Sequence, residues 1–541
     1  MSDRNRFLGF ALAGLPALAY FGFLAAVTSN MPRGDDFFSI LGFLSDWRES
    51  SGWTERLALI NQQYFSHRIA LTRLVALLQA AVTGECHFVA LQVLGWIGWI
   101  AIAASMAFSV NTTRYRPWLT LPVFLLLMQP YGSSNLLSAM QAVGNIGVIG
   151  LALLATKLGA GTSSMRAALA LATAAVATFT SANGLLVAPV LVAMWTAQSR
   201  WRFAFAGAVG ATLIALAYFS GYVQESATFN AGDFLANAAV MSGGFTGIAR
   251  TPLLLVGLAG AVLLAGGAAV LVRRPLWHSH PTHLGFLLFL ILSILMAAWG
   301  RMGWGADYML QDRYRPYGLL MLSTVYVLAL APVPAARATR IGFLVTACAA
   351  TFSLLAYATT VAPLRSYARW TEATAINHSL GGHFLLTSGP TWSSEVRSLD
   401  RAAKLGIYQL PSALPPTTID RLRALPSTPP SSPSPSPFKI APNAGALGYT
   451  LEPLSENGVS PAEFVLAIHD DHRVVLPLDL RRAPLPRAFS GLTFFGTGFG
   501  YPWPSERYLP GDYTLYGLNR SPDHADFVIA WQHSVLCPAF E

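Results

Sequence analysis

Long runs of apolar residues constrain this chain more than any other feature, because only a membrane or a very large core can cover them. Eleven windows match membrane-spanning helices: residues 7–29, 87–109, 117–130, 143–157, 166–181, 184–198, 203–220, 252–272, 284–300, 317–332 and 341–362. Charged residues make up only 11% of the chain, against roughly 25% in an ordinary soluble protein. We therefore predict an α-helical polytopic membrane protein and exclude both a soluble enzyme and a disordered chain.

The positive charges are concentrated in the loops on one side of the predicted spans. With a cytoplasmic N-terminus and alternating spans, the inner loops contain twelve cations and one acid, whereas the outer loops to residue 362 contain nine cations and ten acids. Lys and Arg gather in the short cytoplasmic loops of membrane proteins. The net charge of +9 thus indicates orientation in a bilayer and not a nucleic-acid partner.

An odd number of spans places everything after the membrane domain (1–362) outside the cytoplasm. Residues 363–425 have short helical patterns, and the Pro/Ser-rich segment 426–439 is typical of an extended linker. Residues 440–541 alternate short β-like runs with turns, which predicts a small β-sandwich. Its aromatic residues (Tyr501, Trp503, Tyr508, Tyr513, Tyr516 and Trp531) fit either the core of that sandwich or a carbohydrate-binding surface.

The first outer loop (30–86) contains the best candidates for acid–base chemistry. Asp35 and Asp36 follow the first span directly and precede two Phe, an environment that raises the pKa of a carboxyl group by desolvation. The alternative is that the pair caps a helix beginning at Phe37. His67 and Arg68 lie later in the same loop, before an apolar helical pattern that we interpret as interfacial.

Neutral polar residues dominate the second outer loop (129–145). Gln129, Asn135 and Gln141 have amides that both donate and accept hydrogen bonds, which suits recognition of sugar hydroxyls. The alternative is that these amides satisfy backbone groups where a helix breaks. A further outer loop, 221–251, carries two acids but no comparable motif.

The outer loop 300–316 carries Arg301, Arg313, Tyr314 and Arg315. Cations on the outer face oppose the orientation rule, and Arg is well suited to binding phosphate through two parallel hydrogen bonds. We therefore predict a phosphate site in this loop. The alternative is a structural network in which these Arg pair with Asp307 and Asp312.

The outer motifs occur in the order GDDFF, SHRIALTR, QPYGSSNLLSAMQ, SANGLLVAP and GRMGWGADYMLQDRY. This order, over residues 1–330, resembles an uncharacterised group of bacterial membrane proteins similar to the GT-C class of polytopic glycosyltransferases. The resemblance implies a catalytic acid just after the first span, at Asp35 or Asp36. It also implies a bacterial inner-membrane protein with a periplasmic C-terminal domain.

One departure from the GT-C pattern concerns metal. Many such enzymes have a second acidic motif in a later outer loop, and here only Glu225, Asp233, Asp307 or Asp312 could supply it. The use of a divalent metal ion as cofactor is therefore left open.

These features together predict transfer of a sugar from a polyprenyl-phosphate donor to an extracytoplasmic glycan, glycolipid or protein. The Asp would act as general base, and the outer Arg residues with His67 would hold the leaving phosphate, giving inversion at the anomeric carbon. A transporter or flippase is the competing class, but it favours inverted repeats and ionisable groups near mid-membrane. A polymer ligase or acyltransferase with a lipid-linked donor also remains open.

Overall fold

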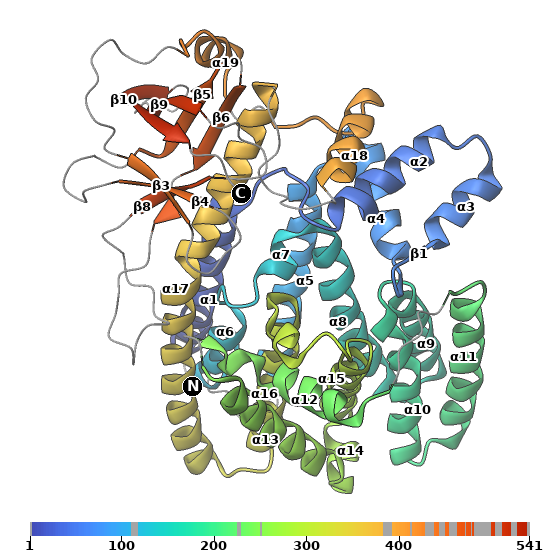
Figure 1. The fold of residues 1–541 in the computed structure, drawn as a ribbon. Helices are drawn as coiled ribbons and strands as arrows, with labels where there is room; N and C mark the ends of the chain where they lie inside the picture. The colour runs from blue at the N-terminus through green and yellow to red at the C-terminus, as the bar shows by residue number, and fades with distance from the viewer. Residues whose placement is uncertain are drawn as a thin grey trace. The chain divides into compact units, whose positions relative to one another are not determined.

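A computed structural model of the chain is mostly helical, with small sheets near the C-terminus (Figure 1). It describes residues 3–109, 117–223, 229–248, 251–381, 392–411, 414–427, 438–442, 449–453, 462–470, 472–477, 479–480, 499–503, 511–520 and 527–537. The chain divides into two compact units. The helical unit comprises Met1–Ala26, Pro32–Tyr357 and Leu405–Tyr408, and the C-terminal unit comprises Val27–Met31, Ala358–Lys404 and Gln409–Glu541.

The longer helices of the helical unit follow the predicted apolar windows. They are α1 (Asp3–Val27), α5 (Phe88–Ser109), α8 (Ala139–Gly159), α9 (Ser164–Thr178), α10 (Val187–Ala197), α11 (Trp201–Phe219), α13 (Leu253–Leu271), α15 (Pro281–Trp299), α16 (Arg315–Leu330) and α17 (Ala335–Ser379).

Six of the described helices are long and apolar enough to cross a membrane, namely α5, α8, α11, α13, α15 and α17. The third predicted window, 117–130, forms only the 3-10 turn η2 (Pro117–Thr120) and the seven-residue helix α6 (Leu121–Leu127). Pro117 begins η2 and Pro122 lies in the first turn of α6, the position in a helix at which proline is favoured. The count of eleven spans therefore stays a prediction.

Shorter elements connect these helices. They are the π-helix η1 (Phe37–Gly42), α2 (Phe43–Glu49), α3 (Trp53–Asn61), β1 (Gln63–Tyr64), β2 (His67–Arg68), α4 (Ala70–Thr83), α7 (Ser134–Leu137), η3 (Ala182–Leu186), α12 (Ala231–Gly243), η6 (Ala306–Leu310) and η7 (Asp312–Tyr314). The predicted loop 221–251 thus contains a helix, α12, which packs closely against α13. A Cβ atom added at Gly243 would lie 1.9 Å from the carbonyl oxygen of Val256, so only glycine fits there.

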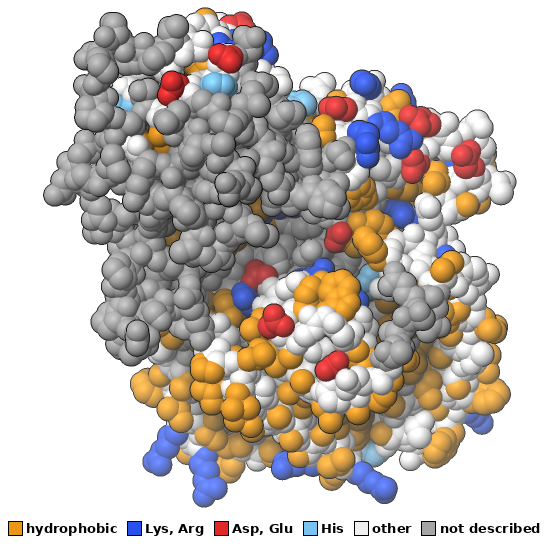
Figure 2. Space-filling view, in the orientation of Figure 1, with side chains coloured by type: hydrophobic (Ala, Val, Ile, Leu, Met, Phe, Trp, Pro, Cys, Tyr) orange, Lys and Arg blue, Asp and Glu red, His pale blue; other side chains and the backbone are white. Residues whose placement is uncertain are grey.

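Hydrogen bonds place alternate loops at opposite ends of the helical unit. At one end, the Asn183 side chain after α9 donates to the Tyr317 hydroxyl at the start of α16. At the other end, Trp195 and Arg200 both donate to the carbonyl of Gly159 at the end of α8. Figure 2 shows Lys and Arg side chains along the lower end of this unit, with no Asp or Glu visible beside them.

The C-terminal unit begins inside α17 and not after it. The predicted boundary at 362/363 falls within this continuous 45-residue helix, whose second half belongs to the C-terminal unit. The predicted connector, 363–425, also includes α18 (Trp392–Lys404) and α19 (Pro416–Arg423). Of the predicted linker 426–439, residues 428–437 lie outside those described.

Two four-stranded antiparallel sheets follow, with strand orders β10-β9-β5-β6 and β3-β4-β8-β7. The strands are β3 (Phe438–Pro442), β4 (Tyr449–Pro453), β5 (Phe464–His469), β6 (His472–Pro477), β7 (Asp479–Leu480), β8 (Phe499–Trp503), β9 (Gly511–Arg520) and β10 (Phe527–Cys537). The register pairs Phe464 of β5 with Pro477 of β6 and with Leu518 of β9.

Helices cover one face of the first sheet. Ile376 of α17 and Ile419 of α19 share a buried cluster with Phe464 and Leu518, and the Asn377 amide exchanges two hydrogen bonds with the backbone of Val475. The prediction of a β-sandwich did not include these helices, which form a layer on the first sheet of this unit. Tyr513 and Tyr516 are buried, which fits core packing, whereas the side chains of the other four aromatic residues lie outside those described.

Candidate functional site

Asp36 is fully buried and ties the first outer loop to the start of α8. A tight turn at Gly34, with φ of +51°, lets the Asp36 amide bond to the Arg33 carbonyl at 3.0 Å. The carboxylate then accepts hydrogen bonds from the Ser138 hydroxyl at 3.1 Å and from the backbone amides of Ala139 and Met140 at 3.1 and 2.8 Å.

These bonds explain why an acid is buried here. The first amides of a helix lack partners within the helix and carry partial positive charge, so they favour a carboxylate. Burial raises the pKa of Asp36 to about 6, although the hydrogen bonds that it accepts lower it. Asp36 thus caps α8, a helix more than 100 residues away, and makes no side-chain cap on the helix at Phe37. These contacts give Asp36 a structural role, and its catalytic role stays a prediction.

Asp35 has a different environment from its neighbour. It is half-buried, and its Oδ1 accepts a hydrogen bond from the hydroxyl of Tyr64 at 3.0 Å. Its Oδ2 has no hydrogen-bond partner within the described part of the chain. Asp35 is therefore the carboxylate of the pair that remains available to a ligand.

Tyr64 and His67 face each other across the β1–β2 hairpin, which pairs Tyr64 with His67 and Gln63 with Arg68. The Arg68 guanidinium is buried and donates to the carbonyls of Asn61, Tyr218 and Ser220. Arg68 thus holds the hairpin against the end of α11. Three of its donors are used in this structural role, and its contact with phosphate stays a prediction.

His67 is a neutral hydrogen-bond donor at the centre of the site. Its Nδ1 accepts from the backbone amide of Ala182 at 3.2 Å, so a neutral ring carries its proton on Nε2. Burial, together with the positive charges of Arg301 and Arg313, lowers the pKa of His67 to about 4. The imidazole is therefore neutral at pH 7 and lies within electrostatic reach of both arginines.

Arg301 and Arg313 are held by aromatic rings. Arg301 Nε donates to the Tyr314 hydroxyl at 3.2 Å, and Arg313 donates to the Tyr308 hydroxyl. The Arg301 guanidinium lies 5.5 Å from the centre of the Trp304 ring, and that of Arg313 lies 5.1 Å from Tyr314. Neither arginine forms an ion pair among the described residues, so both charges remain available to an anion.

Arg315 differs from these two residues because it pairs with Asp312 and stacks at 3.8 Å on the ring of Tyr131. Asp312 also accepts from the backbone amide of Ser134 at 3.2 Å. The predicted structural network thus holds for Arg315 but not for Arg301 and Arg313. Tyr314 orients Arg301, so its predicted place beside the phosphate becomes a supporting one.

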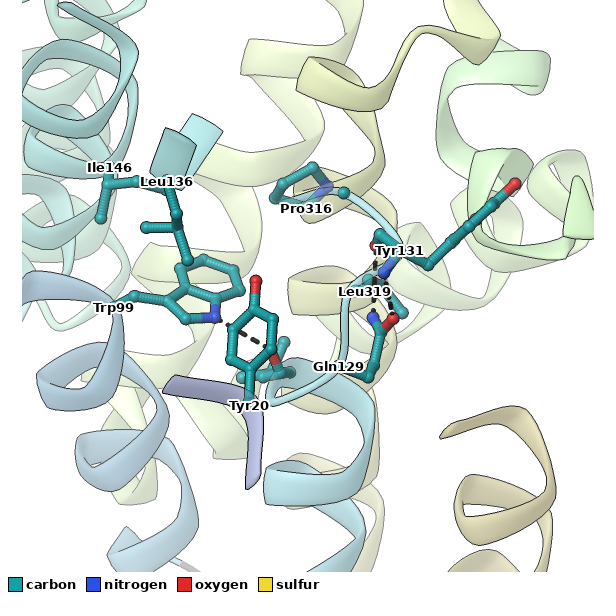
Figure 3. Close-up of a pocket in the computed structure, with 10 residues that line it drawn as sticks. Tyr20, Trp99, Gln129, Tyr131, Leu136, Ile146, Pro316 and Leu319 are labelled. Carbon is teal, nitrogen blue, oxygen red and sulfur yellow. Dashed lines mark hydrogen bonds between the residues drawn. The ribbon is translucent and has the colours of Figure 1, made fainter. Parts of the chain in front are cut away.

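Two of the three predicted sugar-binding amides are used within the chain. Asn135 donates to the Arg313 carbonyl at 3.0 Å and accepts from Asn145 at 2.9 Å. The Gln129 amide folds back on the backbone of Tyr131, as Figure 3 shows, and lines a pocket with room for about one water molecule. These contacts match the alternative of backbone satisfaction.

Gln141 is the exception among the three amides. It lies in the first turn of α8, directly after the residues that bind Asp36. Its Oε1 is buried and has no hydrogen-bond partner within the described residues. A buried polar atom without a partner costs free energy unless a ligand or water satisfies it. Gln141 therefore remains a candidate for contact with a substrate hydroxyl.

Sequence reasoning missed Tyr64, Trp304 and Tyr308. The hairpin that carries Tyr64 turns through Phe65 and Ser66, without the Gly, Asn or Asp typical of such turns. Phe65 takes a φ of +47°, which is unfavourable for that residue and gives no signal in the sequence.

Among the described residues, no group of three or more His, Cys, Asp or Glu side chains is arranged to hold a metal ion. Comparison of the chain with known protein families, with characterised proteins and with solved structures finds no match. The resemblance to GT-C glycosyltransferases accordingly stays a prediction.

Proposed function

We propose that this chain is an inverting membrane glycosyltransferase of the GT-C type, which moves a sugar from a polyprenyl-phosphate donor to an extracytoplasmic acceptor. One observation supports this most. Among the described residues, Asp35 Oδ2 has no hydrogen-bond partner, and the same end of the helical unit carries a neutral histidine and two arginines, Arg301 and Arg313, that form no ion pair. A general base and an anion site are the two parts that such a transfer needs.

In the proposed reaction, Asp35 Oδ2 accepts the proton of the acceptor hydroxyl. The acceptor oxygen attacks the anomeric carbon while the bond from that carbon to the phosphate oxygen breaks, and the electron pair leaves with the polyprenyl phosphate. Arg301 and Arg313 stabilise the charge of this phosphate, and His67 donates from Nε2. Gln141 accepts a hydrogen bond from a sugar hydroxyl. Because attack and departure occur on opposite faces, the configuration inverts.

The proposed setting is a bacterial inner membrane with eleven spans, a cytoplasmic N-terminus and a periplasmic C-terminal unit. The cations at one end of the helical unit support this orientation. The ionisable residues at its other end lie in loops and not at mid-helix, which favours a transferase over a transporter. The acceptor would be a cell-envelope glycan, a glycolipid or a protein.

The test uses the full chain in proteoliposomes with a panel of polyprenyl-phosphate sugars of known anomeric configuration. We expect transfer to an envelope acceptor fraction, with a product of the opposite configuration by NMR. Asp35→Asn should lower this transfer by about 100-fold or more, whereas Arg337→Gln, a substitution at the basic end, should not change it. Transfer with retention of configuration, or no transfer from any donor of the panel, would contradict the proposal.

A further inference from the structure

The Tyr64 hydroxyl fixes one oxygen of Asp35 and leaves the other free. It donates to Oδ1 at 3.0 Å, while Oδ2 has no partner among the described residues. Burial and the nearby charge of Asp35 raise the pKa of Tyr64 well above its usual value, so the phenol stays protonated and acts as a donor. A carboxylate held by one oxygen has a defined direction for its second oxygen.

The hairpin that carries Tyr64 is anchored independently of Asp35. The Gln63 side chain exchanges two hydrogen bonds of 2.9 Å with the backbone of Val223, and the Tyr222 hydroxyl donates to the Ser66 carbonyl at 3.2 Å. Arg68 adds its contacts with Tyr218 and Ser220. The position of Tyr64 is therefore set by the end of α11 and not by the carboxylate that it binds.

The same hairpin carries His67 directly opposite Tyr64. Side chains that face each other across an antiparallel pair have Cβ atoms roughly 5 Å apart. One short hairpin thus holds a contact to the carboxylate and the histidine near Arg301 and Arg313. In-line displacement requires the base and the leaving group to be held at a fixed separation, on opposite sides of the reacting carbon.

We infer that Tyr64 is a positioning residue, which directs the free oxygen of Asp35 at the acceptor hydroxyl and, through its hairpin, sets the distance from this base to the phosphate site at His67. This inference rests on the proposed function. It adds to that function a residue with no part in binding either substrate.

The experiment compares Tyr64→Phe with Tyr222→Phe in the full chain, in proteoliposomes with a polyprenyl-phosphate sugar. Each change removes one tyrosine hydroxyl that contacts the first outer loop or its hairpin, but only Tyr64 touches Asp35. We expect Tyr64→Phe to lower kcat about 10-fold with an unchanged KM for the donor. Tyr222→Phe should keep kcat, because Gln63 and Arg68 still anchor the hairpin.

A double variant and a melting curve distinguish failure of this inference from failure of the proposed function. In an Asp35→Asn background, Tyr64→Phe should cause no additional loss, because the tyrosine acts through the carboxylate. If the wild type transfers sugar and Asp35→Asn lowers transfer by about 100-fold or more, but Tyr64→Phe behaves like Tyr222→Phe, the inference fails and the proposed function stands. If the wild type transfers no sugar from any donor, both fail. If Tyr64→Phe lowered Tm and lowered kcat further in the Asp35→Asn background, the effect would be purely structural and the inference would also be overturned.

Discussion

The hydroxyl of Ser138 donates a hydrogen bond of 3.1 Å to Oδ1 of Asp36, and so joins the first outer loop to the start of α8. This buried contact gives the adjacent acids different roles. Asp36 completes the N-terminus of a long helix, whereas Asp35 lies beside Tyr64 and has one oxygen without a partner among the described residues. The turn at Gly34 lets Asp36 reach α8, and the position of Asp36 in turn fixes that of the adjacent candidate base, Asp35.

Substituting each acid by asparagine should separate catalysis from stability. We expect Asp35→Asn to lower transfer by about 100-fold or more, the usual contribution of a general base, with little change in Tm. Asp36→Asn should lower the free energy of unfolding by about 2–4 kcal/mol, because an amide cannot accept all of the buried hydrogen bonds. Transfer assays and thermal melting in detergent measure the two effects. An inactive but fully stable Asp36→Asn protein would reverse these assignments.

The pH dependence of stability provides a separate test of Asp36. Its pKa in the folded protein is about 6, above the ordinary value of 3.8, so the folded state binds more protons than the unfolded state between these values. The contribution of Asp36 is therefore largest below about pH 4 and is lost as pH rises through 6. Relative to Asp36→Asn, we expect the Tm of the wild type to fall between pH 4.5 and pH 7. A difference that grows with pH would contradict burial of the carboxyl.

His67 should show the opposite dependence on pH. Its pKa is lowered from 6.5 to about 4, so the unfolded state binds more protons in this range. The contribution of His67 to stability is full above about pH 6.5 and is lost as pH falls towards 4. Melting of wild type and His67→Gln across this range should show a Tm difference that shrinks on acidification. A constant difference would mean that the ring is solvated and titrates normally.

How much the sequence predicts depends on how far away the partners of a residue lie. Apolar windows and loop motifs depend only on residues that are close in the sequence. They correctly indicated the helices, and they indicated the polar residues that gather at one end of the helical unit. Arg68 and Asp36 looked functional because their partners, Tyr218 and Ser138, lie more than 100 residues away in the chain. No local pattern reveals that such side chains are already paired.

The predicted boundary at 362/363 lies close to the division between Tyr357 and Ala358, but the end of the last predicted helix was missed for a similar reason. Composition changes near Pro363, so the membrane domain was expected to end there, yet α17 continues to Ser379. A proline usually disfavours a helix interior, but packing outweighs this cost. In the C-terminal unit, Ala373 and Ile376 are buried in the cluster that includes the sheet. The second half of the helix is thus required by tertiary contacts that the local sequence does not show.

The two kinds of outer arginine should respond differently to substitution by glutamine. Arg313 contacts Tyr308 and Tyr314 and forms no ion pair among the described residues. We therefore expect Arg313→Gln to raise the KM for a polyprenyl-phosphate donor about 10-fold or more and to leave Tm nearly unchanged. Arg68 donates to three carbonyls, so Arg68→Gln should instead lower the free energy of unfolding by about 2–3 kcal/mol, because these carbonyls lose their donors and the contact with Tyr218 is buried. Donor titrations and melting curves for both variants distinguish the roles. If Arg68→Gln raised the donor KM at unchanged Tm, Arg68 would belong to the phosphate site after all.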